Sequence, residues 1–113
     1  MRRFIVKQGS QLGIRATCRN KQSREPIPLT GATVTLTVVR TDTGAVVFSE
    51  AQTTHSDPAN GVTIFYIDST DLATYGAYEY EVKVVKENTN LPDNEEILYS
   101  ETGKFIIDQK LTP

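Results

Sequence analysis

The chain contains one cysteine, Cys18, one histidine, His55, and no tryptophan. A single cysteine excludes an internal disulfide, and a single histidine excludes a metal or catalytic site built on a histidine pair. The sequence also has no Asn-x-Ser/Thr site for N-glycosylation. These absences lead us to expect a protein that is made and folded in a reducing cytoplasm.

Long hydrophobic runs and clusters of positive charge are also missing. No apolar stretch approaches the ~20 residues of a membrane-spanning helix, and the segment before Lys7 is too short and too poor in apolar residues for a signal peptide. The formal net charge of −2 provides no basic stripe for nucleic acid. Arg2 and Arg3 are the one adjacent basic pair, which is either a phosphate or membrane-surface contact or part of a solvated terminus. We expect no nucleic-acid partner and no membrane insertion.

Residues that could carry a reaction do not form a recognisable constellation. Neither a glycine-rich phosphate loop nor a Ser-His-Asp order is present. Cys18 shares a strand phase with Ile14, which indicates a buried hydrophobe rather than a nucleophile. His55 lies beside a turn and is interpreted as a solvated loop residue. We therefore expect no enzyme, and no catalytic, cofactor-binding or metal-binding residue.

Acidic residues occur in two places where a site could be imagined. Glu79 and Glu81 are two apart on one strand face, as a pair of acids would be, but Lys83 continues the same face and indicates a solvent-facing stripe. The segment 86–96 holds further carboxylates and amides that could bind calcium weakly. These residues lack the spacing of a known calcium loop.

The strongest pattern in the sequence is an alternation between residues 75 and 85. Large residues at Tyr78, Tyr80, Val82 and Val84 are separated by charged ones. A period of two places the large residues on one face of a β-strand and the charges on the other. Because such a strand is half buried, it needs a second layer to cover its apolar face.

Other segments show the same kind of pattern and supply that layer. The predicted strands span residues 3–8, 11–19, 32–40, 45–50, 62–67, 75–85 and 97–108. On two of them we expect a buried face with these members: Leu12, Ile14, Ala16, Cys18, Ala32, Val34, Leu36 and Val38. The run 62–67 is apolar in both phases, so its buried face stays open. The pattern predicts an all-β fold, an immunoglobulin-like antiparallel β-sandwich of about seven strands, as a single domain over residues 1–113.

The connections between these strands are predicted from turn-forming residues. Residues 20–28 form a polar loop whose two prolines exclude a central strand. A single helical turn can begin at Ser69 or Thr70. Residues 86–96 are predicted as a long polar hairpin loop, and Gly103 as a β-bulge in the last strand.

Two sets of motifs resemble those of immunoglobulin-like families. The string Asp71-x-Ala73-x-Tyr75 resembles the Asp-x-Ala-x-Tyr-x-Cys motif of antibody-type domains. That alignment would turn Glu79 and Glu81 into the core, where unpaired carboxylates cost several kcal/mol each, so the strand phase rejects it. Tyr78 is the better candidate for a tyrosine corner, in which a tyrosine at the start of a strand bonds back to the preceding backbone.

A second resemblance covers almost the whole chain. It rests on Phe4-x-Val6-Lys7-Gln8-Gly9-Ser10, on Pro28-Leu29-Thr30-Gly31-Ala32-Thr33-Val34, on Asn60-Gly61-Val62 and on Tyr75-Gly76-Ala77-Tyr78-x-Tyr80-x-Val82. Together these motifs resemble the immunoglobulin-like domains of tailed-phage and prophage structural proteins, especially those of baseplate upper proteins.

The resemblance implies a non-catalytic building block of a virion tail, neck or baseplate. Its expected partners are other virion proteins and copies of itself, without a cofactor. The chain ends at Pro113, shortly after the last predicted strand, so we expect no second, receptor-binding domain. Possible partner contacts are Tyr75, Asp93, Asn94, Glu95 and Glu96. The alternative is a carbohydrate-binding or adhesion module that contacts a host surface through Tyr75 and the loops, with Tyr66 as a further stacking candidate.

Overall fold

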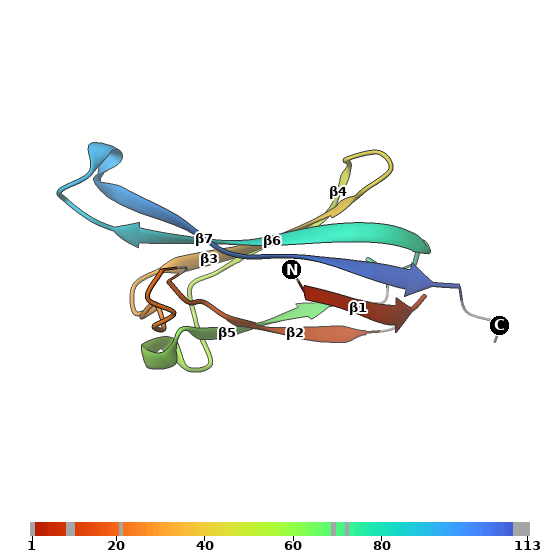
Figure 1. Cartoon of the computed structure of the whole chain (residues 1–113), viewed down its shortest axis with the longest axis horizontal. Coiled ribbons are helices and arrows are strands. Elements are labelled where there is room, and N and C mark those ends of the chain that lie inside the picture. Colours follow the sequence, from red (N-terminus) through yellow and green to blue (C-terminus); the bar gives the residue numbers. More distant parts are fainter. Residues whose placement is uncertain (1, 9–10, 21, 69, 72, 110–113) are drawn as a thin grey trace.

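In the part of the chain that the structure describes, seven strands form two sheets that face each other across the core (Figure 1). The computed structural model describes residues 2–8, 11–20, 22–68, 70, 71 and 73–109. Its strands are β1 (Arg2–Lys7), β2 (Leu12–Thr17), β3 (Thr33–Arg40), β4 (Val46–Gln52), β5 (Val62–Ile67), β6 (Gly76–Glu87) and β7 (Glu95–Asp108). Two short 3-10 turns, η1 (Pro58–Asn60) and η2 (Pro92–Asn94), precede β5 and β7.

The two sheets are unequal in size. The larger sheet has the order β1-β7-β6-β3-β4, and the smaller one pairs β2 with β5. All neighbours are antiparallel except β1 and β7, which run in parallel. The central strands β3, β6 and β7 therefore lie opposite β2 and β5, as in immunoglobulin sandwiches. The predicted all-β sandwich is confirmed.

The alternation along β6 is also confirmed. Its large residues are buried and the charged residues between them are exposed or half-buried; the buried set is Tyr78, Tyr80, Val82 and Val84. β3 pairs with β6 and buries the residues directly opposite, namely Val34, Leu36 and Val38. Since Glu79 and Glu81 are exposed, the antibody-type alignment is rejected by the structure as well.

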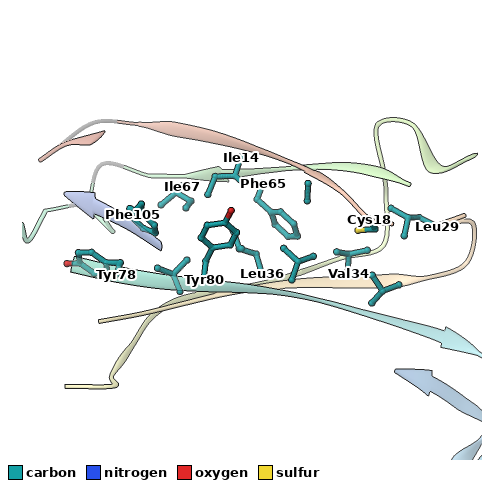
Figure 2. Packing of buried hydrophobic residues seen from close by; sticks show 14 of the residues in the cluster. Ile14, Cys18, Leu29, Val34, Leu36, Phe65, Ile67, Tyr78, Tyr80 and Phe105 are labelled. Carbon is teal, nitrogen blue, oxygen red and sulfur yellow. The ribbon is translucent and has the colours of Figure 1, made fainter. Parts of the chain in front are cut away.

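Aromatic rings fill one end of the core (Figure 2). The rings of Tyr78 and Phe105 are stacked at 5.3 Å with an interplanar angle of 14°, and Tyr80 lies tilted at 6.4 Å from Phe105. Ile14, Phe65 and Ile67 approach from the smaller sheet. The Tyr78 hydroxyl donates to the Thr74 carbonyl at 2.6 Å, which is the predicted tyrosine corner. It fixes the entry of the chain into β6.

The structure settles which face of β5 is buried. Thr63, Phe65 and Ile67 point into the molecule, whereas Tyr66 is exposed. The sequence could not decide this because both phases are apolar. The predicted helical turn falls partly on Ser69 and Leu72, which lie outside the described residues.

Gly103 has a different role from the predicted β-bulge. The register between β6 and β7 shifts between Val82 and Lys83, and Ser100 is the residue passed over. Gly103 pairs regularly with Tyr80, and a Cβ atom built on it would lie 2.4 Å from Tyr80 Cε1. The bulge prediction is wrong because glycine is needed here to admit the neighbouring tyrosine ring.

The predicted loop over residues 86–96 is also too long. β6 continues to Glu87 and β7 begins at Glu95, with Lys86 opposite Glu96. Polar composition suggested a loop, but a hairpin exposed on both faces can be polar throughout and still be paired.

Gly61 holds the start of β5 against the segment that follows β2. It has φ of +74°, and a Cβ atom on it would lie 2.5 Å from the Cys18 carbonyl oxygen and 2.9 Å from that of Ile27. Its own carbonyl accepts a hydrogen bond from Cys18 N at 2.7 Å. Only glycine satisfies both the backbone angle and this close approach.

We expect Gly61→Ala to lower the free energy of unfolding by about 2–5 kcal/mol, because a left-handed alanine is strained and its methyl group would displace two carbonyls. Gly44→Ala is the matched control. Gly44 has φ of +72°, but a Cβ atom there meets nothing within 4 Å. Its cost should stay at about 1–2 kcal/mol. Urea denaturation of both variants measures the difference, and equal losses would show that the carbonyl contacts do not matter.

Candidate functional site

The predicted contact residues lie at two separate places. Asp93 and Asn94 belong to η2, and Glu95 and Glu96 begin β7, so these four lie together at the tip of the β6–β7 hairpin. Tyr75 precedes Gly76, the first residue of β6. Because β6 has 12 residues, roughly 36 Å of strand separates Tyr75 from the tip. They cannot contact one small ligand together.

The hairpin reaches beyond the smaller sheet (Figure 1). β6 and β7 have 12 and 14 residues, whereas β2 and β5 have six each. The molecule measures 53 × 27 × 23 Å, with a radius of gyration of 15.2 Å. A compact domain of this length has a radius of gyration of about 13 Å. The excess reflects the elongated larger sheet, whose far end carries the tip.

Backbone hydrogen bonds give the tip a defined conformation. Asn88 N donates to the Asn94 carbonyl at 2.8 Å, and Asn94 N donates to the Leu91 carbonyl at 3.0 Å. Asp93 and Asn94 have φ values of 58° and 56°. Asp and Asn tolerate this left-handed conformation better than most residues. The local sequence therefore favours the turn that presents these polar side chains.

The hairpin is acidic. Residues 87–103 contain five acidic residues and neither lysine nor arginine; the acids are Glu87, Asp93, Glu95, Glu96 and Glu101. In the last cross-strand pair before the turn, Glu87 lies directly opposite Glu95. Like charges at such a position are destabilising, so this rung does not serve the stability of the hairpin. The next rung pairs Lys86 with Glu96, which is a favourable combination.

One side of β7 lacks a partner strand near the hairpin. β6 accompanies β7 along its whole length, but β1 pairs only with residues 103–108. In the part of the chain that the structure describes, residues 95–102 of β7 therefore have no neighbouring strand on the β1 side. Unpaired N–H and C=O groups along such an edge can accept a further strand.

A hollow lies beside this edge. It has a volume of about 210 Å³ and is lined by Arg19, Asn20, Gln22, Ile27, Leu98 and Tyr99. Hydrogen bonds brace the loop that forms its wall. The Arg19 guanidinium donates to the Arg24 carbonyl at 3.1 Å, and Asn20 Oδ1 accepts from the backbone of Gln22 and Ser23.

Ion pairs fix the other end of the larger sheet. Lys7 Nζ donates to Asp108 Oδ2 at 3.1 Å, which lowers the pKa of that carboxyl and ties the end of β1 to the end of β7. At the β3–β4 turn the Arg40 guanidinium donates to both oxygens of Asp42 and lowers the pKa of Asp42. Both pairs lie far along the sheet from the acidic tip, and they are surface ion pairs rather than parts of a site.

Tyr66 forms a second candidate site on the smaller sheet. Its side chain is 73% exposed, against 53% for Tyr75. Its ring lies over Gly13, where a Cβ atom would be 3.4 Å from Tyr66 Cε1. A hollow of about 360 Å³ beside it is lined by Gln11, Gly13, Tyr66, Ile67 and Asp68. The sequence ranked Tyr75 first because the buried phase of β5 was not known.

His55 is not the solvated loop residue that the sequence predicted. It is half-buried, with Nε2 2.9 Å from the Ala32 carbonyl oxygen and Nδ1 3.2 Å from Thr63 Oγ1. Because a carbonyl only accepts, Nε2 carries the hydrogen in the neutral ring, and the Thr63 hydroxyl donates to Nδ1. Thr63 in turn accepts from Gln52 Nε2 at 3.0 Å. His55 therefore joins β5 to the start of β3.

The other candidates from the sequence have simple positions. Cys18 is buried, as predicted, and Glu79 and Glu81 are exposed on the outer face of β6. The side chains of Arg2 and Arg3 lie outside the described part of the structure. Among the described residues, no group of three or more His, Cys, Asp or Glu side chains is placed to hold a metal ion. No helix in the described ranges is long and apolar enough to cross a membrane.

Comparison with protein-family models finds no match, and neither does comparison with curated proteins.

The acidic rung yields a test of the hairpin. We expect Glu95→Lys to raise the free energy of unfolding by about 0.2–1 kcal/mol, because it places a lysine opposite Glu87. Glu87→Lys should do the same. The double variant should lose the gain, since two lysines then face each other. Urea denaturation of the two single variants and the double variant measures these changes in the free energy of unfolding. If the double variant gains the sum of the two single gains, Glu87 and Glu95 do not interact.

Proposed function

We propose that this chain is a non-catalytic structural module of a tailed-phage or prophage particle that acts through protein–protein contacts. It is made in the host cytoplasm and built into the tail, neck or baseplate. The phage-like motifs along the chain support the assignment to such a particle, and the immunoglobulin-like sandwich is the fold that those motifs imply.

The observation that carries the proposal is the β6–β7 hairpin. It extends past the smaller sheet, ends in a hydrogen-bonded acidic tip, and leaves part of β7 without a neighbouring strand. No residue of the tip, 88–94, belongs to the hydrophobic core, and in the open part of β7 Leu98 packs against the edge of that core. The Glu87–Glu95 rung even opposes stability, which is expected where a surface is shaped for a partner.

A ring-shaped particle would make such a contact effective. Identical copies around a symmetric ring repeat the same interface, so a contact that is weak in one copy gains by multivalency. The module is therefore expected at a fixed number of copies per particle, together with virion proteins and with further copies of itself.

Shortening the hairpin tests this role. Replacing residues 88–94 by a two-residue Asn-Gly turn keeps Glu87 opposite Glu95 and suits a hairpin. We expect a nearly unchanged melting temperature, because no residue of this segment belongs to the core. Incorporation into purified particles, measured as copies per particle by quantitative mass spectrometry, should fall. If the wild-type chain is not found in particles, the virion role is wrong; if the shortened chain assembles normally, the hairpin is not the contact.

A second function, carbohydrate binding or adhesion, is favoured by one observation. The exposed ring of Tyr66 stands beside a hollow that also presents the Gln11 amide and the Asp68 carboxylate. An aromatic face with a few polar groups can stack on a sugar ring and bond its hydroxyls.

Glycan-array binding tests this second function. Tyr66→Ala should abolish any sugar signal, while Tyr75→Ala, which removes another exposed tyrosine, should leave it unchanged. Both variants should fold, because neither side chain is buried. A wild-type protein without any signal, or equal losses in the two variants, would remove the Tyr66 site.

A further inference from the structure

We infer that residues 95–102 of β7 accept an extended, basic strand from another protein, which adds to the larger sheet and places one apolar side chain in the hollow beside Leu98 and Tyr99. This inference rests on the proposed assembly role and names the chemistry of the partner.

The first argument is the backbone. β7 pairs with β6 from Glu95 to Ile107, with Ser100 passed over at the register shift, and with β1 only from Gly103 onward. An incoming strand would occupy, over residues 95–102, the side that β1 occupies over residues 103–108. It would extend the existing sheet beside the loop that lines the hollow with Leu98 and Tyr99. Main-chain hydrogen bonds of this kind supply affinity that does not depend on the partner's sequence.

The second argument is the hollow. Leu98 and Tyr99 lie within the stretch of β7 that has the open side. Both line the hollow together with Ile27, Asn20, Gln22 and the cationic Arg19, so the side chain that enters it should be apolar while the basic ones lie nearer Glu95 and Glu96. Its volume of about 210 Å³ is below the roughly 300–1,000 Å³ of small-molecule sites. It suits a single side chain of a strand running past it. Pockets for alternate side chains are the usual source of specificity in strand addition.

The third argument is charge. Residues 87–103 carry five acidic groups and no basic one. A second copy presenting the same edge would bring equal negative charge against it, which disfavours pairing between identical edges. Lysine or arginine on the incoming strand would instead neutralise Glu95 and Glu96 and relieve the repulsion between Glu87 and Glu95. A basic partner is therefore favoured over another copy of this chain.

The probe is a synthetic peptide of about eight residues in which lysine alternates with valine and one central position is leucine. Amide hydrogen exchange is followed by NMR on the full chain with and without about 1 mM peptide. In the free protein, the amides of residues 95–102 that point away from β6 should exchange fast. The peptide should protect these amides selectively, since those pointing toward β6 are already bonded.

Three comparisons test the parts of the inference. An otherwise identical peptide with glutamate for lysine should bind less well, as should one with alanine for the central leucine. Glu95→Lys should weaken binding of the lysine peptide about three- to tenfold at low salt. The matched control Glu50→Lys makes the same charge change at an exposed position of β4, the opposite edge of the sheet, and should leave affinity unchanged.

Several results would overturn the inference. Protection on β4 instead of β7 would place strand addition at the other edge, and no protection anywhere would show that the open side does not accept a strand. Protection of residues 95–102 in the free protein that rises with its concentration would identify a second copy as the occupant. The peptide assay uses the isolated protein, so its result is independent of the virion role. Strand addition can be wrong while the chain is still found in virions, and it can be right if the chain is absent from them.

Discussion

The short sheet formed by β2 and β5 is the constraint on which the rest of the molecule depends. Its strands have six residues each, so they cover only part of a larger sheet whose longest strands have 12 and 14. Apolar side chains on β6 are buried where that cover exists. Beyond it, both faces of the hairpin meet water, and acidic and amide residues are interspersed with the exposed apolar side chains of Leu91, Ile97 and Tyr99. The core and the projecting hairpin are thus two consequences of the same mismatch in length.

The fold could be predicted from the sequence where burial on one face imposes a period of two. β6 and β3 alternate strictly, and Tyr78 could be chosen for the tyrosine corner because its phase is that of the core. The length of the paired part of the hairpin could not be predicted, because a strand that is exposed to solvent on both faces has the same polar composition as a loop. Gly103 was misread because its requirement comes from Tyr80 on the neighbouring strand. His55 was misread because its acceptor at Ala32 is 23 residues away in the chain.

The candidate site was predictable only in part. The carboxylates from Asp93 to Glu96 could be recognised as a surface from their polarity. Their separation from Tyr75 follows from the unbroken length of β6, which sequence boundaries could not give. The open side of β7 depends on where β1 ends its pairing, and no local pattern encodes that. The exposure of Tyr66 could not be predicted, because β5 is apolar in both phases and only the structure shows that Phe65 and Ile67 are the buried ones.

The continuous path of β7 has a mechanical consequence. The strand runs from the acidic tip to Asp108. It pairs with β6 from Glu95 to Ile107, with Ser100 passed over, and with β1 over its last six positions. Because the tip joins β6 and β7, a pull on it along the strand axis moves the two strands together. It loads the bonds from β6 to β3 and from β7 to β1 in shear, since those bonds are perpendicular or slanted to the strands. A pull across the sheet would instead separate the hairpin from β3 one residue pair at a time, beginning at Val85 and Thr33. The domain therefore resists tension along its long axis better than across it.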